Sequence, residues 1–511
     1  MVAVEADRQA DAGSGPAAQM IPRPVLYALV AVALVHVARS AGVVADFWDA
    51  VRYPFEIDYG EGIVWQQAEL FGTGQMYAPV TGFPFLVFHY PPLYYALVAA
   101  VRPLFDDGLA AGRGVSAMAS VGLAVLVACV VVRASPRGLT RGPLLLAGIA
   151  GLSVLCSGNV WTWGLLMRVD LVAIALSFLG LLVAHRSGGR FAPTALALLV
   201  CAAAVFTKQL QVSAGIAVFV VALMQQPRSA LLAIGCVGSA GLVVLGLIQW
   251  RTMGGFLHHV VDYNVNPLSL RYLAGVLQIE SRDALLLATG LVSAILVWRG
   301  LPAWRDLALQ TRSDPVTASH VLALGHYGLC ALTLPAAAKE GSNANYFIEF
   351  LASGGVLTGL AAMTWLQAGR WRWLGYQQAI LCVAALANPY REMPALERAQ
   401  DSAAQWAVVA RIRQANCRVA SENMTLLLRA GCVVEYEPAI VAQLANIGSW
   451  DQAPLLAITR DRRFAFMITT DDRLTLVSLR TPAVDAAMRA AYPTVEAIAP
   501  GIWINRPAEG D

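Results

Sequence analysis

The chain has 511 residues, of which 58% are hydrophobic and only 14% are charged, and its mean hydropathy is +0.59. These values lie far from the averages of soluble proteins and exclude an ordinary water-soluble enzyme. The formal net charge is only +3, and we expect no nucleic-acid partner. The composition is that of an integral membrane protein surrounded by membrane lipids.

Apolar runs near the roughly 20 residues needed to cross hydrocarbon recur from Val25 to about Asn388. The first, about Pro24–Val44, follows a polar tail (1–23) without an evident cleavage site, and we interpret it as a retained anchor. Further spans are expected near Gly114–Val132, Pro143–Thr162, Val169–Ala184, Pro193–Phe206, Gln211–Met224, Ala230–Trp250, Ala284–Val297, Ala318–Leu334, Asn345–Leu366 and Trp373–Ala387. Leu93–Phe105 is short for a crossing, so the sequence predicts roughly 11 to 13 transmembrane helices over residues 24–390.

Arginines fall in every second loop, and short cation-rich loops stay in the cytoplasm. This pattern places the tail 1–23 in the cytoplasm, and the first loop (45–92) and the domain 391–511 on the extracytoplasmic side. Only two of the 36 basic residues are lysines, a skew typical of GC-rich bacterial genomes. The sequence therefore predicts a multi-pass protein of a bacterial inner (plasma) membrane. The arginines are Arg133, Arg137, Arg141, Arg186, Arg190, Arg299, Arg305, Arg312, Arg370 and Arg372.

The first loop concentrates acidic residues in a chain whose spans hold few. Within 16 positions it contains Asp46, Asp49, Glu56, Asp58 and Glu61, and an aromatic segment, His89–Tyr95, follows. Carboxylates held at a membrane face indicate acid/base chemistry on a lipid-linked substrate. The alternative is that Asp58 only caps the following interfacial helix, which includes Trp65–Leu70.

The two lysines, Lys208 and Lys339, stand at extracytoplasmic helix ends. A compact ammonium binds phosphate as a point charge, which favours phosphate binding at these positions. The alternative is that both residues merely extend to the membrane interface.

Six of the eight cysteines lie in or near apolar runs and are interpreted as packing residues. Cys417 and Cys432 instead open short apolar runs, 418–421 and 433–436, which we interpret as neighbouring parallel strands joined by a helix (423–430). That arrangement predicts a Cys417–Cys432 disulfide and an oxidising location. With strands at 464–468 and 475–479 and helices at 439–447, 454–459 and 481–492, the region predicts a small α/β domain.

A set of short motifs resembles the GT-C superfamily of membrane glycosyltransferases, and within it the protein mannosyltransferase and lipid A sugar transferase group (glycosyltransferase family 39-like). The resemblance covers about residues 20–390. The motifs are the first-loop acids, Met76-Tyr77 after a Gly-x-Gly turn, Tyr90–Tyr95, Arg168-Val169-Asp170, Thr207-Lys208-Gln209 and Gly341–Tyr346.

The resemblance implies transfer of a hexose or pentose from a polyprenyl-phosphate donor to a lipid, glycan or protein acceptor on the extracytoplasmic side. Asp58 matches the family's first-loop catalytic acid and is expected to act as general base, with Glu61 as second acid. The family's acids are commonly adjacent, whereas these are three apart. The donor phosphate is expected to meet Lys208, Arg168, Lys339 and His89, and the remaining substrate contacts are expected from Tyr59, Tyr90, Tyr94, Asn343 and Asn345.

Several of these residues have a plainer interpretation. Arg168 is equally suited to a structural ion pair with Asp170, and His89 to a backbone hydrogen bond at a rigid turn. Asn343 and Asn345 are also ordinary loop residues. No residue is assigned as a metal ligand, because the adjacent His258 and His259 point different ways. The resemblance requires no cofactor, but it leaves a divalent cation (Mg²⁺ or Mn²⁺) at the first-loop acids open.

Two other classes compete with an enzyme. A transporter or flippase of a lipid-linked saccharide would also carry charges in a cavity, but such proteins commonly show repeats and midspan polar helices. A membrane anchor for a C-terminal binding domain leaves the many spans and the acidic loop without a purpose. The sequence therefore favours a glycosyltransferase.

Overall fold

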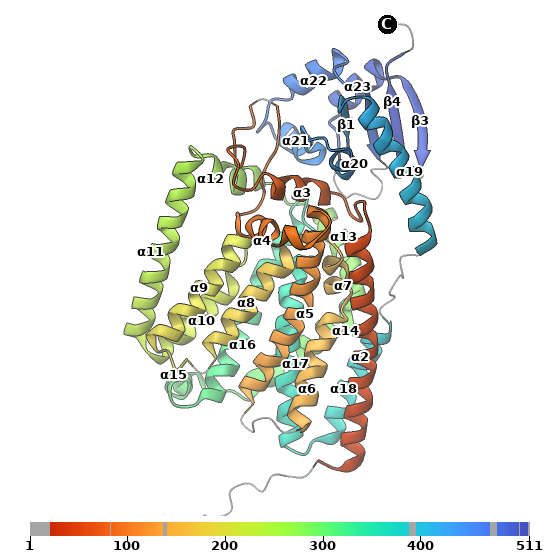
Figure 1. The fold of residues 1–511 in the computed structure, drawn as a ribbon. Helices are drawn as coiled ribbons and strands as arrows, with labels where there is room; N and C mark the ends of the chain where they lie inside the picture. Colours follow the sequence, from red (N-terminus) through yellow and green to blue (C-terminus); the bar gives the residue numbers. More distant parts are fainter. Residues whose placement is uncertain are drawn as a thin grey trace, which may run out of the picture.

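Long apolar helices stand side by side through most of the chain, and a smaller α/β domain covers one end of them (Figure 1). This computed structural model describes residues 21–81, 83–135, 141–185, 187–387, 395–470, 478–499 and 501–508. Most of the predicted cytoplasmic tail (1–23) lies outside this range. The bundle helices are α2 (Arg23–Arg52), α5 (Gly108–Ala134), α6 (Arg141–Leu155), α8 (Asp170–Ala184), α9 (Phe191–Thr207), α10 (Ser213–Gln225), α11 (Pro227–Arg251), α14 (Ala284–Arg299), α16 (Pro315–Thr333), α17 (Tyr346–Gln367) and α18 (Trp371–Ala387).

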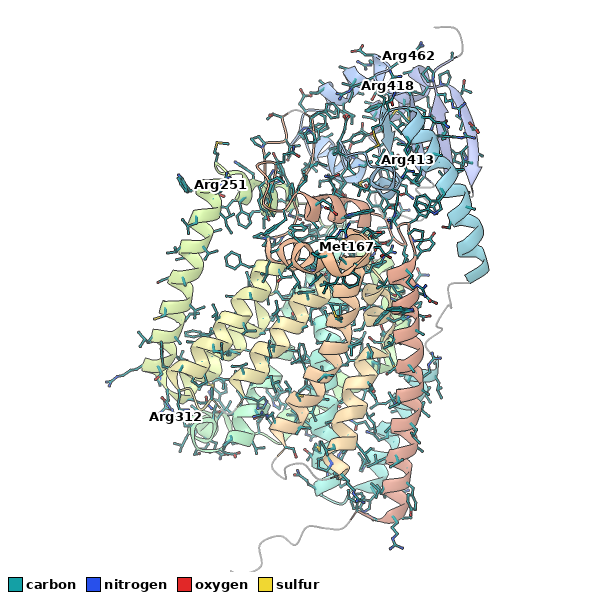
Figure 2. All side chains as sticks on the ribbon, viewed as in Figure 1. Met167, Arg251, Arg312, Arg413, Arg418 and Arg462 are labelled. Carbon is teal, nitrogen blue, oxygen red and sulfur yellow. A yellow bond between two sulfur atoms is a disulfide. The ribbon has the colours of Figure 1, made fainter. Side chains whose placement is uncertain are left out.

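Ten of the eleven predicted spans each coincide with one of these helices, and the span 143–162 is divided between α6 and a further short helix. Among the described residues, six helical stretches are long and apolar enough to cross a membrane, or seven if a bent pair forms one span. The others are shorter than a comfortable crossing, as in the sequence. The short apolar segment after the first loop forms α4 (Leu93–Val101), which lies across the end of the bundle (Figure 1). Arg312, in α15 (Trp304–Ser313), lies at the end of the bundle opposite to Arg418 (Figure 2).

Helix α17 forms the centre of the bundle, with 83% of its most apolar window buried, whereas α11 has only 6% buried and lies at the edge. Glycines let neighbouring helices approach α17 closely. A Cβ at Gly355 would lie 2.6 Å from Val154, and one at Gly359 would lie 2.6 Å from Val131. Larger residues at these glycines would separate α17 from α5 and α6.

The predicted span 143–162 is broken. Helix α6 ends at Leu155, and α7 (Gly158–Gly164) departs at 61°. Asp283 stabilises the new N-terminus, because its two carboxylate oxygens accept the N–H groups of Gly158 and Asn159 at 2.9 and 3.0 Å. The break turns the chain toward the segment that carries Arg168.

The first loop begins later than the sequence indicated, because α2 continues to Arg52 and includes Asp46 and Asp49. These two acids therefore lie on the helix. The loop then forms α3 (Glu61–Glu69) before α4. Helix α12 (Gly255–Val260) lies at the same end (Figure 1), and α13 (Leu270–Glu280) continues through Ser281–Asp283 into α14 as one helical stretch.

The C-terminal domain follows α19 (Ala395–Gln414) and has a four-stranded sheet in the order β1-β2-β4-β3. β1 pairs parallel with β2, and β4 pairs antiparallel with both β2 and β3. Its elements are β1 (Val419–Ser421), α20 (Met424–Arg429), α21 (Pro438–Asn446), α22 (Ala453–Arg460), β2 (Phe466–Thr470), α23 (Pro482–Ala491), β3 (Thr494–Ala499) and β4 (Ile502–Arg506).

The predicted helices of this domain are confirmed, but two strand assignments change. Residues 433–436 form no strand, and Tyr436 instead makes an isolated bridge to Phe85 of the first loop. Most of the predicted strand 475–479 lies outside the described residues. The β3–β4 pair was not predicted, since its segments lack a clear alternation of apolar and polar residues.

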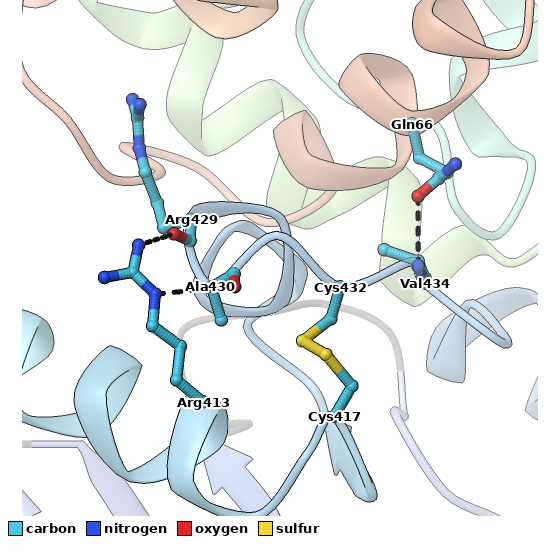
Figure 3. Close-up of a disulfide and its surroundings, with 7 residues drawn as sticks. All are labelled: Gln66, Arg413, Cys417, Arg429, Ala430, Cys432 and Val434. Atoms are coloured by element: carbon cyan, nitrogen blue, oxygen red, sulfur yellow. Dashed lines mark hydrogen bonds between the residues drawn. A yellow bond between two sulfur atoms is a disulfide. The ribbon is translucent and has the colours of Figure 1, made fainter.

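The predicted disulfide between Cys417 and Cys432 is confirmed (Figure 3). Its setting differs from the expected pair of strands: Cys417 precedes β1, and Cys432 follows α20 in a loop. Two residues further on, the N–H of Val434 donates to Gln66 Oε1 of α3 at 3.0 Å (Figure 3). The disulfide therefore restrains the chain where it meets the first loop.

Arg429 joins the C-terminal domain to the bundle. It pairs with Asp107, donates to the carbonyl of Pro54 and stacks 4.9 Å from the Trp65 ring centroid. Close approach also requires Gly62, where a Cβ would lie 2.7 Å from Met424. These contacts fix α20 and α21 over the first loop.

Candidate active site

A cavity of about 310 Å³ lies where the first loop, the bundle ends and α21 meet. Nine of the eleven residues expected to bind substrate or take part in catalysis line it; Glu61 and Tyr94 do not. The polar lining comprises Asp58, Tyr59, His89, Tyr90, Arg168, Asp170, Lys208, Gln209, Asn264, Asn266, Tyr272, Lys339, Ser342, Asn343, Asn345, Tyr346, Glu437 and Gln443. Residues far apart in the sequence thus share one concave site.

Asp58 is the most accessible carboxylate in the cavity lining, with 43% of its side chain exposed. Arg168 Nη2 donates to Asp58 Oδ2 at 2.7 Å and also to the carbonyl of Tyr59. Gly60 permits this turn, because its φ is +91° and a Cβ there would lie 3.2 Å from the guanidinium. Burial by itself lowers the pKa of Arg168, but the neighbouring Asp58 charge raises it above its ordinary value. Arg168 therefore stays charged and orients Asp58.

Lys208 occupies the position directly after α9 and faces the start of α8. Its Nζ lies 2.5 Å from Asp170 Oδ1, which also accepts from Asn345 Nδ2 at 2.8 Å. The ammonium stands 4.8 Å from the Tyr346 ring centroid. The alternative ion pair suggested by the sequence, between Arg168 and Asp170, does not form, because each residue pairs with a different partner.

Lys339 adds a third cation to the cavity lining. Burial, and then the charge of Lys208, lower its pKa below the ordinary value. Within the described ranges, Lys339 has no carboxylate within ion-pair distance. The cavity therefore holds one cation that no acid neutralises, beside two that are already paired.

The opposite wall comes from the C-terminal domain. Glu437 directly precedes α21, and its Oε2 lies 3.5 Å from His89 Nε2. Tyr59 Oη accepts the N–H of Ala439 at 3.0 Å, and burial followed by the Glu437 charge raise the tyrosine pKa well above its ordinary value. His89, which was expected to meet the donor phosphate, lines the cavity beside the carboxylate of Glu437.

Glu61 was expected to be a second catalytic acid, but it is 0% exposed. Arg113 Nε donates to Oε1 at 2.8 Å, and Nη2 donates to Oε2 at 2.7 Å. The N–H groups of Met167 and Ile57 donate at 2.8 and 2.7 Å. Burial alone would raise the pKa of Glu61, but Arg113 and these hydrogen bonds hold it below its ordinary value. Glu61 organises the loop that carries Asp58.

Tyr94 also lies outside the cavity. It is 0% exposed, and its hydroxyl donates to the carbonyl of Gly112 at 3.2 Å. Tyr94 belongs to α4 and is fully buried there, so its role is packing. Tyr90 does line the cavity, and burial raises its pKa to about 12, so it stays protonated at neutral pH.

His259 fastens the first loop to α12. Its Nδ1 accepts the N–H of Phe88 at 3.0 Å, and its Nε2 lies 2.7 Å from the carbonyl of Ala78. Burial lowers the pKa of His259 to about 4, so the ring is neutral and Nε2 carries the proton. The adjacent His258 instead pairs with Asp262 at the surface, 2.6 Å away.

A divalent cation at the first-loop acids does not fit these contacts. Asp58 is held by Arg168, and both oxygens of Glu61 are occupied by Arg113 and backbone N–H groups. An ion bridging the two acids would have to displace a buried guanidinium.

The sequence reasoning missed two contributors to the site. Arg113 is 0% exposed near the start of α5, and an arginine that close to an apolar run signals an acidic partner. Glu437 carried no such signal, since only the tertiary fold brings α21 over the cavity.

The fold is the one seen in two solved structures of the membrane protein ArnT. The crystal structure of ArnT from Cupriavidus metallidurans in the apo state is similar with a TM-score of 0.56 at 12% identity, over 92% of this chain and 97% of that chain. ArnT bound to undecaprenyl phosphate gives a TM-score of 0.52 at 11% identity, over 93% and 98%. No protein-family profile matches the sequence, and no curated protein does. At these identities the similarity establishes the fold.

Proposed function

We propose that this protein is a glycosyltransferase that moves a hexose or pentose from a polyprenyl-phosphate donor to an acceptor at the extracytoplasmic membrane face. The observation that carries the proposal is the cavity itself, where an accessible carboxylate, Asp58, stands among three cations. The ArnT structure of the same fold, solved with undecaprenyl phosphate, supports a polyprenyl-linked donor.

In the proposed reaction, the hydroxyl oxygen of the acceptor attacks the anomeric carbon of the donor sugar. A free oxygen of Asp58 takes the hydroxyl proton during this attack. The bond from the anomeric carbon to the donor phosphate oxygen breaks, and polyprenyl phosphate leaves with the bonding electrons. Arg168, Lys208 and Lys339 stabilise the charge of the departing phosphate. Arg168 also holds Asp58 in place through the 2.7 Å contact. No step passes through a metal ion.

An apolar groove of about 300 Å³ supports a lipid-linked donor. It lies between α9, α10 and α11, and Phe206 and Gln211, on either side of Lys208, both line it. We place the polyprenyl chain in this groove, because an apolar tail beside the ammonium would present its phosphate to the cavity. The acceptor, a lipid, glycan or protein, would enter from the C-terminal domain.

The extracytoplasmic orientation is supported by two features. The disulfide between Cys417 and Cys432 belongs to the domain over the cavity, and disulfides persist in oxidising compartments. Arg312 lies at the opposite end, as expected for a cytoplasmic loop (Figure 2). Together with the arginine-rich composition, these features support a bacterial inner membrane with the N-terminus in the cytoplasm.

The test is turnover of a panel of labelled polyprenyl-phosphate sugars by the purified protein in lipid nanodiscs. The proposal expects one donor to release polyprenyl phosphate, with the sugar transferred to an acceptor from a membrane extract or slowly to water. A parallel assay follows passage of the same lipid-linked sugars across proteoliposomes. Passage of a lipid-linked sugar without cleavage of any donor would show that the protein is a transporter or flippase and not an enzyme.

A further inference from the structure

A buried cluster of three metal-ligand side chains lies on α16 and α17. His326 and Cys330 are one turn apart on α16, and Glu349 belongs to the first turn of α17. All three are buried, with 1%, 1% and 7% of their surface exposed. Neither the proposed reaction nor the cavity lining uses them.

The separations within this cluster match those of ligands around zinc. Zinc binds Cys, His and carboxylate atoms at about 2.0 to 2.3 Å in tetrahedral sites, which places neighbouring ligand atoms roughly 3.3 to 3.6 Å apart. His326 Nε2 lies 3.1 Å from Glu349 Oε1 and 3.4 Å from Cys330 Sγ. The three ligand atoms all fall within 4.8 Å of one another.

The surrounding contacts also suit a metal ligand. Ser353 Oγ lies 3.1 Å from His326 Nδ1 and accepts its proton when Nε2 binds an ion, which is the usual way a ligating imidazole is oriented. Ser213, the first residue of α10, lies beside the Cys330 thiol. Its buried Oγ has no hydrogen bond of ordinary geometry within the described part of the chain. The three side chains leave the fourth ligand position of a tetrahedral ion for this serine or for a water molecule.

The charge of the buried ligands gives a further reason to expect a metal ion at this cluster. An ionised carboxylate buried inside a span is costly unless it is paired. A divalent ion with one thiolate, one carboxylate and one neutral imidazole has no net charge. Such a centre is well suited to an apolar interior.

We propose that His326, Cys330 and Glu349 bind one Zn²⁺ ion that clamps α16 to α17. The role is structural. Tyr346 is one turn before Glu349 on α17, and its ring centroid stands 4.8 Å from Lys208 Nζ in the cavity. The ion therefore holds the helix start that carries part of the cavity wall. The inference is independent of the proposed reaction.

The test is the zinc content of the full-length protein in nanodiscs, measured by plasma mass spectrometry after incubation with Zn²⁺ and dialysis. The proposal expects about one zinc per chain, falling at least fivefold in Cys330→Ala and in Glu349→Gln. Cys156→Ala is the matched control, because Cys156 is also a buried cysteine outside the disulfide but contacts Ser40 of α2 instead of the cluster, and it should retain the metal.

Co²⁺ gives a second readout on the unmodified protein, which needs no variant to fold. The proposal expects the visible bands of a tetrahedral cobalt site with a thiolate ligand, and their loss when Zn²⁺ is added. Less than a tenth of a zinc per chain, no cobalt bands, or equal zinc in wild type and Cys330→Ala would each overturn it. The cluster would then be a hydrogen-bonded histidine and glutamate beside a thiol.

Discussion

Glu61→Gln separates a catalytic acid from a structural one. The substitution keeps the size of the side chain and removes its charge. Glu61 and Arg113 are both 0% exposed, so no water can replace the lost carboxylate. The structure therefore predicts an effect on folding, whereas the sequence alone placed Glu61 in the reaction.

The expected magnitude follows from the contacts. Removing one partner of a buried ion pair costs about 3–5 kcal/mol, because the other charge stays buried without compensation. Arg113 would keep its hydrogen bonds to the carbonyls of Ala50, Tyr53 and Phe55. It would, however, face the neutral amide group of the substituted side chain where it now meets two carboxylate oxygens.

The assay is unfolding in detergent followed by tryptophan fluorescence, with activity measured on the fraction that remains folded. Glu69→Gln is the matched control. Glu69 belongs to the same helix, but its side chain is 47% exposed and lies 3.7 Å from Arg102. Exposed pairs contribute about 0–1 kcal/mol, so the control should unfold near wild type.

The double variant Glu61→Met with Arg113→Met completes the test. Because neither charge is then buried alone, it should lose less stability than the sum of the two single changes, by at least about 1 kcal/mol. The reasoning would be refuted if Glu61→Gln unfolded like wild type while transfer fell 100-fold. Glu61 would then be a catalytic group, as the sequence suggested.

Three further predictions concern other parts of the molecule. Lys208→Met should weaken undecaprenyl phosphate binding about 10- to 150-fold, the value of one charge-assisted hydrogen bond; an unchanged dissociation constant would remove Lys208 from the phosphate site. Burial lowers the pKa of His259 from 6.5 to about 4, so the unfolded chain binds more protons between these values. Stability should therefore fall by up to about 3 kcal/mol as pH drops from 6.5 to 4, and His259→Asn should flatten that slope in pH-dependent unfolding. Replacing Cys417 and Cys432 by alanine should cost about 3 kcal/mol for the 15-residue loop, and a reductant that lowers the melting temperature of wild type should leave this variant unchanged.

The bundle was predictable because a membrane span is a local property of the sequence. Ten of the eleven apolar runs, such as Pro193–Phe206, each became one helix, here Phe191–Thr207. The break between α6 and α7 was not visible, since it depends on Asp283 from a distant helix. The β3–β4 pair was missed for a similar reason, because those strands are defined by their partners in the sheet.

The candidate site was predictable where a residue is unusual for its position. Asp58 and Lys208 stand out as charged groups at helix ends, and both line the cavity. The pairing among charges was not predictable, because it depends on side-chain directions at the helix ends: Arg168 turns to Asp58, while Asp170 turns to Lys208. Glu437 was beyond sequence reasoning altogether.

In the proposed reaction, Asp58 removes a proton during sugar transfer in this cavity. The most direct measurement compares wild type with Asp58→Asn for transfer from the active polyprenyl-phosphate sugar and for binding of that donor. Asp262→Asn is the control, because the Asp262 side chain is exposed and lies outside the cavity lining. Asp58→Asn should lose transfer by about 100-fold or more and should bind the donor within a few-fold of wild type. Wild-type transfer by Asp58→Asn, or equal losses of binding and transfer, would contradict this role of Asp58.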